Sequence, residues 1–460
     1  MSRRLPVITT RRLVAVVVAL ATLSSTATVR AQAPDTTPPV STVAPVAETT
    51  ASPTTTAAPG PLTPVAYVAD VLAFIERYAY RVPLVDWPAI RVRAEAKAVG
   101  AVTIADTYPI VIEAVKALGD KHSSFTKPVD AVKQTAGNYT GFGFLASMPS
   151  RVVVTIAPGG PAARAGLRVA DRIDKVDGKT PPIVGNALAV GRRADGTFAD
   201  TVILRVARPL VGRPLMLTLR RGEVTLVSIP VTSPPPKVVI PREFGYLDVP
   251  GIVGDAAVQK NFANQVQGLI RDLDNGNRCG WIVDLRKNRG GYIYALLAGL
   301  GPLLGDAIVG GSRNVKGEVT SWSYRAGVVS AGDTTAVSVD APYALRRPGA
   351  AVAVLTSGLT ASAGEASVIF FRGAANARTF GEPTIGLTTF NIRHALADGA
   401  FLDITNAVDV DRNLTPYDGP IAPDEPVAID WVAVNNGNDA ALQSASSWLR
   451  SQPSCATPAA

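Results

Sequence analysis

Apolar side chains recur at helical spacing over residues 63–139. Residues 110–118 predict one helix with a buried face, and an earlier series predicts another, formed by Val68, Val71, Leu72, Ile75 and Ala79. Residues three and four apart lie on the same side of a helix, and an apolar side packs against a core. We therefore expect a helical N-terminal domain over these residues.

The pattern changes over residues 140–233. Short apolar runs alternate there with turns that contain Gly, Pro or Asp, and the clearest runs are residues 152–156, 202–206 and 215–219. Apolar, β-branched runs of this length between turn residues are typical of strands. Residues 161–166 predict one short helix among them, so we expect a small, mostly β domain.

Strand and helix patterns alternate over residues 237–455. The predicted strands are residues 244–249, 280–286 and 351–356, and the predicted helices are residues 255–274, 292–304 and 366–371. Such alternation is typical of a sheet covered by helices. The predicted fold class is therefore α+β with several domains: a helical N-terminal region, a β-rich module and an α/β domain.

The first 62 residues differ in composition from the remainder of the chain. Four arginines precede an apolar run at residues 13–23, and the small-x-small sequence Ala-Gln-Ala follows at 31–33. A run of about eleven residues is too short to span a bilayer, so residues 1–33 predict a cleaved signal peptide and export. An uncleaved N-terminal anchor is the alternative. Residues 34–62, rich in Pro, Thr, Ala and Ser, predict a disordered linker.

Removing the predicted signal peptide changes the charge of the chain. Residues 1–33 hold five of the 45 basic residues and none of the 37 acidic ones, so the net charge falls from +8 to +3. This balance does not favour a nucleic-acid partner. The two histidines, His122 and His394, are too few for a typical zinc site, so we expect neither a metal nor a cofactor. Cys279 and Cys455 predict one disulfide in an exported protein, with two free thiols as the alternative.

The segment Thr360–Glu365 carries the clearest indication of chemistry. It joins a predicted strand to a predicted helix, so Ser362 lies at a helix N-terminus, where unpaired backbone N–H groups favour negative charge. A serine in this place can act as a nucleophile beside an anion-binding site. It can equally serve only as a helix cap, and the segment by itself leaves both interpretations open.

Four segments, in chain order, resemble the C-terminal-processing (tail-specific) serine peptidase family. They are GFGFL at 141–145 with APGGPAARAGL at 157–167, IVDLRKNRGG at 282–291, TASAGE at 360–365, and GEPTIG at 381–386. The resemblance covers about residues 63–435. It implies a PDZ domain over residues 140–233 and a crotonase-like (ClpP-like) α/β peptidase domain over residues 237–455.

The resemblance also implies roles for particular residues. Ser362 matches the nucleophile, and the backbone N–H groups of Gly290 or Gly291 and of Ala363 match the oxyanion hole. For the two glycines, an ordinary turn is the alternative. Glu365 follows Ser362 on the same helical face and can hold the site together by hydrogen bonds, or can act only as a favourable charge at the helix N-terminus.

One departure from the family changes the expected base. In the Ser-Lys branch a lysine follows the last glycine of the fourth segment, whereas this chain has Leu387, which cannot accept a proton. The sequence LGDKHSSF at 118–125 resembles the tricorn-like branch, whose histidine comes from the N-terminal region. The expected base is therefore His122, because an imidazole accepts and returns a proton at neutral pH. His394 is the alternative.

A further residue should orient the imidazole of His122. The tricorn-like branch has a serine just before the histidine, where this chain has Lys121. Glu365 is the first candidate for that role, with Asp424 and Glu425 as weaker ones, and Ser123 or Ser124 can stand in for the serine of the family.

In the PDZ-like segment, the backbone amides of Gly141, Phe142, Gly143 and Phe144 would bind a C-terminal carboxylate, and the strand that follows would pair with the peptide. A closed groove that only gates the active site is the alternative.

The expected function is that of an exported serine endopeptidase that acts on peptides or unfolded protein C-termini, outside the cytoplasm or at the cell envelope. A catalytically inactive, PDZ-containing binding or scaffold protein on the same fold is the alternative.

Overall fold

The computed structural model describes residues 62–456 except 149, 182, 185–186, 189, 192–197 and 226–236. The predicted signal peptide, and all but the last residue of the predicted linker, lie outside the described residues. None of the described helices is both long and apolar enough to cross a membrane.

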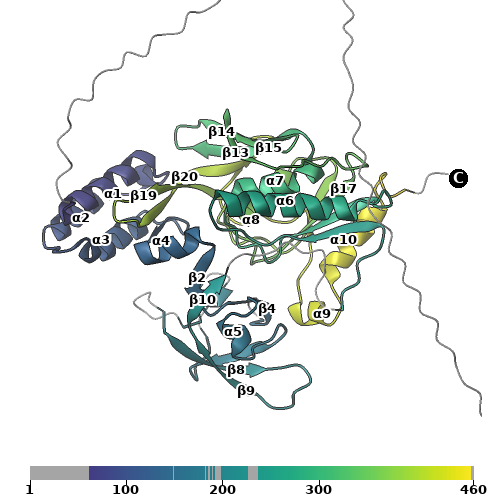
Figure 1. The fold of residues 1–460 in the computed structure, drawn as a ribbon, viewed down its shortest axis with the longest axis horizontal. Helices are drawn as coiled ribbons and strands as arrows, with labels where there is room; N and C mark the ends of the chain where they lie inside the picture. The colour runs from purple at the N-terminus through teal and green to yellow at the C-terminus, as the bar shows by residue number, and fades with distance from the viewer. Residues whose placement is uncertain are drawn as a thin grey trace, which may run out of the picture. The chain divides into compact units, whose positions relative to one another are not determined.

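The N-terminal part is helical, drawn in purple and blue in Figure 1. Its elements are α1 (Pro64–Tyr78), η1 (Val82–Leu84), α2 (Trp87–Ala98), α3 (Ile104–Ala117) and α4 (Pro128–Thr135). Helices α1, α2 and α3 begin after Thr63, Asp86 and Thr103, whose side-chain oxygens accept hydrogen bonds from the first turn. The five residues of the predicted apolar face are all buried: four lie in α1, and Ala79 is its C-cap.

The β-rich module follows. Its elements are β2 (Asn138–Gly141), β3 (Phe144–Ala146), β4 (Val153–Ile156), α5 (Pro161–Arg164), β5 (Arg172–Val176), β6 (Ile183–Val184), β7 (Ala187–Leu188), β8 (Thr201–Ala207), β9 (Leu215–Arg220) and β10 (Gly222–Thr225). The strands form small antiparallel sheets. In β8 buried and exposed residues alternate, so that Val202, Leu204 and Val206 face the core of the module.

A parallel sheet forms the centre of the C-terminal part. Its strands lie in the order β11 (Phe244–Asp248), β12 (Gly280–Asp284), β17 (Ala351–Thr356), β18 (Ala377–Gly381) and β22 (Glu425–Pro426). Residues of β11, β12 and β17 are buried on both faces of the sheet, which explains why these strands read as continuous apolar runs.

Helices cover both faces of this sheet. One face packs against α6 (Ala256–Leu273), α7 (Ile293–Leu304) and α8 (Ala363–Phe371). The other face packs against α10 (Ala440–Arg450), which follows α9 (Trp431–Asn435) and is drawn in yellow in Figure 1. A disulfide between Cys279 and Cys455 joins the residue before β12 to the chain beyond α10, as the disulfide interpretation predicted.

A second, antiparallel sheet was not part of the expected alternation. It contains β1 (Ser124–Thr126), β13 (Ala307–Asn314), β14 (Val319–Arg325), β15 (Val328–Ala331), β16 (Thr334–Ser338), β19 (Thr389–Ala395), β20 (Phe401–Asp411) and β21 (Pro416–Tyr417). Strand β20 pairs with β1, with Ser124 opposite Asp403, and also with β19. At this end of the sheet, β20 therefore lies between β1 and β19.

Candidate active site

Ser362 lies in a strained turn between β17 and α8. Its backbone has φ 55° and ψ −126°, and a positive φ is uncommon for a residue with a side chain. The Oγ atom of Ser362 lies 2.8 Å from Nε2 of His122, which is 240 residues away in the chain. The structure thus brings together the predicted nucleophile and the predicted base.

The loop that carries His122 is held on both sides. The carboxylate of Asp120 accepts hydrogen bonds from the backbone N–H groups of His122 (2.9 Å) and Ser123 (2.5 Å) and from the Ser123 hydroxyl (2.8 Å). On the other side, the Asn391 side chain donates to the backbone carbonyl of His122 at 3.0 Å. The position of the imidazole is therefore set by local turn bonds and by a strand of the antiparallel sheet.

Thr389 is the residue that contacts the far side of the imidazole. Its Oγ1 lies 2.7 Å from Nδ1 of His122. Neither serine named from the sequence does this, because the Ser123 hydroxyl bonds to Asp120 and to the backbone of Thr405, and Ser124 is exposed in β1. The carboxylates of Asp424 and Glu425 do not do it either, because they pair with Arg372 and Arg378. Sequence reasoning missed Thr389, since a lone threonine at the start of a strand carries no motif.

Burial affects the acid–base character of His122. It lowers the pKa of the imidazole below its ordinary value, and the carboxylates of Asp120 and Asp403 oppose this shift. The neutral ring is thereby favoured. With Nδ1–H donating to Thr389, Nε2 is left as an acceptor for the Ser362 hydroxyl proton, which is the arrangement a general base needs.

Glu365 is fully buried and holds the nucleophile turn against the segment 384–387. Its carboxylate accepts hydrogen bonds from the N–H of Ser362 (2.8 Å), the hydroxyl of Thr384 (2.5 Å) and the N–H groups of Gly386 and Leu387 (2.7 Å each). Burial raises the pKa of Glu365, and these bonds oppose the shift. Because both oxygens are engaged here, Glu365 organises the site and does not orient His122.

The predicted oxyanion-hole residues lie beside the nucleophile. A Cβ on Gly290 would stand 2.7 Å from Cβ of Ser362, and its φ is +93°. The Gly290 N–H donates to Oδ1 of Asn288 at 2.8 Å. Among the described residues, the N–H groups of Gly291 and Ala363 have no hydrogen-bond partner. Of the predicted donors, these two are therefore the ones available to an oxyanion.

The predicted carboxylate-binding residues line one cavity of the β-rich module. Gly141, Phe142, Gly143 and Phe144 border a cavity of about 590 Å³, together with Leu145, Val190 and Arg221. Gly143 has φ +77°, a conformation that glycine adopts without strain and that lets the chain turn between β2 and β3. His394 lies elsewhere: its ring stacks on Phe74 and its Nε2 is 3.4 Å from Asp70 in α1.

Comparison with protein families matches two parts of the chain. Residues 243–427 match the model of peptidase family S41, and residues 152–208 match that of the PDZ domain. The α+β fold class predicted from the sequence is confirmed by the structure together with these matches.

Individual relatives agree with the family matches. The nisin-resistance protein of Lactococcus lactis subsp. lactis is 29% identical over 218 residues, which are 47% of this chain and 63% of the relative. The chloroplastic carboxyl-terminal-processing peptidase 2 of Arabidopsis thaliana is 25% identical over 337 residues, which are 69% of this chain and 60% of the relative. The chain thus spans less than two thirds of these curated relatives.

A solved lipoprotein from Streptococcus agalactiae shares the fold, with a TM-score of 0.55 and 18% identity over 85% of this chain and 97% of that protein. The chain therefore carries a domain of peptidase family S41, preceded by a PDZ domain.

Proposed function

We propose that this protein is a serine endopeptidase whose nucleophile is Ser362 and whose general base is His122. The observation that carries the proposal is the contact of 2.8 Å between Ser362 Oγ and His122 Nε2, within a peptidase-family domain that lacks the lysine of the Ser-Lys branch. A nucleophile and a base at hydrogen-bond distance, with the base oriented by another group, are the signature of covalent catalysis.

The proposed reaction follows from this geometry. His122 Nε2 takes the hydroxyl proton while Ser362 Oγ forms a bond to the carbonyl carbon of the substrate. The N–H groups of Gly291 and Ala363 then bind the oxygen that becomes negative. The imidazolium returns the proton to the leaving amine as the peptide bond breaks, and a water molecule, activated in the same way, releases the acyl group from Ser362.

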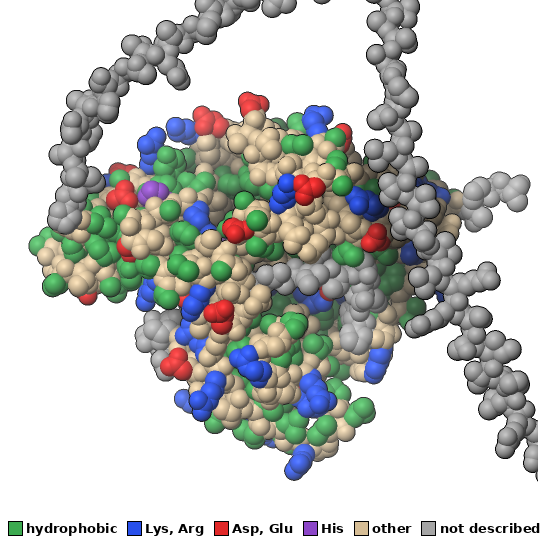
Figure 2. Space-filling view, viewed as in Figure 1, with side chains coloured by type: hydrophobic (Ala, Val, Ile, Leu, Met, Phe, Trp, Pro, Cys, Tyr) green, Lys and Arg blue, Asp and Glu red, His purple; other side chains and the backbone are tan. Residues whose placement is uncertain are grey.

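The proposed substrates are peptides and unfolded protein C-termini. The PDZ domain supports this proposal, because such domains bind a peptide end through backbone amides and a strand edge. Residues 140–233 contain 13 basic and 6 acidic side chains, and Lys and Arg predominate on the visible face of this module in Figure 2. This charge favours a terminal carboxylate. One relative is named for nisin resistance, so antimicrobial peptides belong among the candidates.

Export is part of the proposal. It is supported by residues 1–33, whose arginines, apolar run and small-x-small sequence are typical of a signal peptide, and by the disulfide between Cys279 and Cys455, since disulfides persist in oxidising compartments. N-terminal sequencing of the secreted protein would check it, and a mature chain that still begins at residue 1 would contradict cleavage.

A fluorophosphonate probe tests the proposed Ser-His pair. The parent protein should label at Ser362, and Ser362→Ala and His122→Ala should each lower the rate of labelling by at least about 100-fold. His394→Ala is the matched control and should label at the parent rate. Labelling that survives His122→Ala would show that another group is the base, and a folded parent that does not label would favour the binding-protein alternative.

A further inference from the structure

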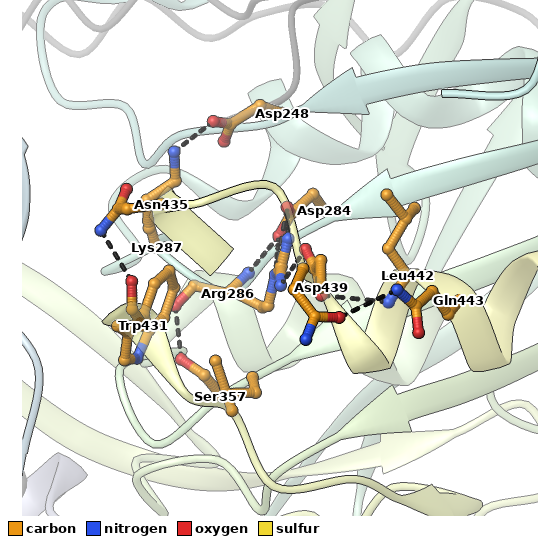
Figure 3. A network of polar contacts seen from close by, with 12 residues as sticks. Asp248, Asp284, Arg286, Lys287, Ser357, Trp431, Asn435, Asp439, Leu442 and Gln443 are labelled. Carbon is orange, nitrogen blue, oxygen red and sulfur yellow. Dashed lines mark hydrogen bonds and ion pairs between the residues drawn. The ribbon is translucent and has the colours of Figure 1, made fainter. Parts of the chain in front are cut away.

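A buried arginine lies between the parallel sheet and the C-terminal helices. Arg286 follows β12 directly and is 1% exposed. Its guanidinium contacts one carboxylate that is close in the chain and one that is distant: Nη2 lies 2.6 Å from Asp284 Oδ2, and Nη1 lies 2.8 Å from Asp439 Oδ2. Figure 3 shows both pairs, with the ring of Trp431 beside the guanidinium at 5.6 Å from Cζ.

Asp439 connects this arginine to α10. It is the N-cap residue of α10, and its Oδ1 accepts a hydrogen bond from the N–H of Leu442 at 3.1 Å. Beyond the other end of α10, Cys455 is bonded to Cys279, the residue before β12. A helix of eleven residues and a strand of five are both roughly 16 Å long. Helix α10 is therefore fastened to β12 at both of its ends.

The backbone around Arg286 is bonded to the nucleophile turn. The carbonyl of Arg286 accepts a hydrogen bond from the Ser357 hydroxyl at 2.6 Å, and the carbonyl of Leu285 accepts one from Thr360 Oγ1 at 2.9 Å. Three residues after Leu285, the carbonyl of Asn288 accepts a bond from the N–H of Ala361 at 2.9 Å. The loop that ends in Gly290 and Gly291 is thus attached to the turn that presents Ser362.

The physical cost of this network indicates its role. Charged groups lose hydration when they are buried, and replacing a buried ion pair with well-packed apolar residues often leaves stability unchanged or improves it. An ion pair is consequently a poor way to stabilise the fold, but it fixes orientation well. Oxyanion-hole donors need such precision, because a displacement of about 1 Å lowers a rate by roughly 100-fold.

We propose that Arg286 is a positioning residue and that α10, through Asp439, braces the segment that supplies the oxyanion-hole amide. This inference rests on the proposed function. The match to the peptidase family ends at residue 427, so Asp439 and α10 lie outside the matched residues, whereas Arg286 lies within them. The loop after β12 is held from one side by the nucleophile turn and from the other by the C-terminal helix.

The test replaces one oxygen of the network. Asp439→Asn keeps an N-cap side chain for α10, because asparagine caps as well as aspartate, but removes the charge that faces Arg286. Asp255→Asn is the matched control: Asp255 is the N-cap of α6, with 2.9 Å to the N–H of Val258, and has no ion pair within the described part of the chain.

Two readouts separate positioning from folding. In hydrogen exchange measured by mass spectrometry, peptides that cover residues 285–291 should exchange at least about tenfold faster in Asp439→Asn, and should be unchanged in Asp255→Asn. With a peptide that the parent protein cleaves, the kcat of Asp439→Asn should fall by about tenfold or more while its KM stays within about twofold, because an oxyanion forms only in the transition state.

The outcomes are distinguishable. A folded Asp439→Asn protein whose hydrogen exchange at residues 285–291 and whose kcat equal those of the parent would overturn the proposal that α10 braces this loop. If that variant does not fold, Ser357→Ala decides, since it removes the bond to the Arg286 carbonyl, and parent-like exchange and kcat would overturn the proposal. A parent that neither labels nor cleaves, but whose loop loosens in Asp439→Asn, would contradict the proposed function and support the brace.

Discussion

Thr389 Oγ1 lies 2.7 Å from Nδ1 of His122, on the side of the ring opposite Ser362. A hydroxyl carries no charge, so Thr389 can orient the imidazole but stabilises its protonated form less than a carboxylate would. The pKa of His122 is raised by Asp120 and Asp403, yet burial outweighs both. The pair of His122 and Ser362 therefore depends on geometry more than on a neighbouring negative charge.

Removing the hydroxyl of Thr389 should weaken the base. Thr389→Val keeps the shape of the side chain and loses the hydrogen bond to Nδ1, so the rate of fluorophosphonate labelling should fall about tenfold, as expected for one lost orienting bond. Thr389→Ser should stay within about threefold of the parent. The measurement is the rate of fluorophosphonate labelling of each variant, and a Thr389→Val protein that labels at the parent rate would exclude the orienting role.

As the pH is lowered, kcat/KM should begin to decline only below pH 6.5. His122 must be neutral to accept a proton, and burial lowers its pKa from the ordinary value of 6.5. A plot of kcat/KM against pH should thus remain flat through pH 6.5 and decline only in more acidic solution. An acid limb centred at or above pH 6.5 would contradict the assignment of His122 as a buried base.

The same shift predicts a loss of stability in acid. Between pH 6.5 and the lowered pKa of folded His122, the unfolded chain binds a proton that the folded chain does not. The free energy of unfolding should therefore fall as pH falls through this window. Denaturant titrations at several pH values measure it, and His122→Ala should lack this component.

Gly290→Ala should abolish activity, because the added methyl group would collide with the turn that presents Ser362. The added Cβ would stand 2.7 Å from Ser362 Cβ and 2.8 Å from the Ala361 carbonyl, at φ +93°. Gly276→Ala is the matched control, because Gly276 has φ +85° and no atom within 4 Å of the added Cβ. Both variants carry the backbone strain of about 1 kcal/mol, but only Gly290→Ala should lose labelling. Equal labelling of the two variants would show that the turn tolerates the added methyl group.

Breaking the disulfide should destabilise the C-terminal part. Cys279 and Cys455 are 176 residues apart, and closing so long a loop stabilises by roughly 5 kcal/mol in the chain-entropy model. The double variant Cys279→Ala, Cys455→Ala should unfold at a lower denaturant concentration than the oxidised parent. A reductant should lower the parent midpoint and leave the variant unchanged. Coincident midpoints for variant and oxidised parent would show that the bond adds no stability.

Local patterns predicted the elements whose apolar residues form a regular or continuous series. The helix expected at residues 255–274 appears as α6, and the strand expected at residues 280–286 appears as β12, each shortened by two residues. The antiparallel sheet of β13 to β16 escaped prediction. Its strands hold few apolar residues between polar ones, as the sequence VTSWSYR of β14 illustrates, where only Trp322 and Tyr324 are buried, so their apolar period is weak.

The sequence by itself determined strands β11, β12 and β17, helices α6, α7 and α8, the turn that presents Ser362, and the absence of a lysine base at Leu387. These features depend on neighbours within a few residues, where spacing and side-chain type decide the conformation. Tertiary structure alone decided that His122 meets Ser362, that Thr389 contacts the far side of the imidazole, and that Asp439 faces Arg286. Each of these contacts joins residues more than 100 positions apart, and only strand pairing and helix docking in the folded chain bring such residues to within 3 Å of each other.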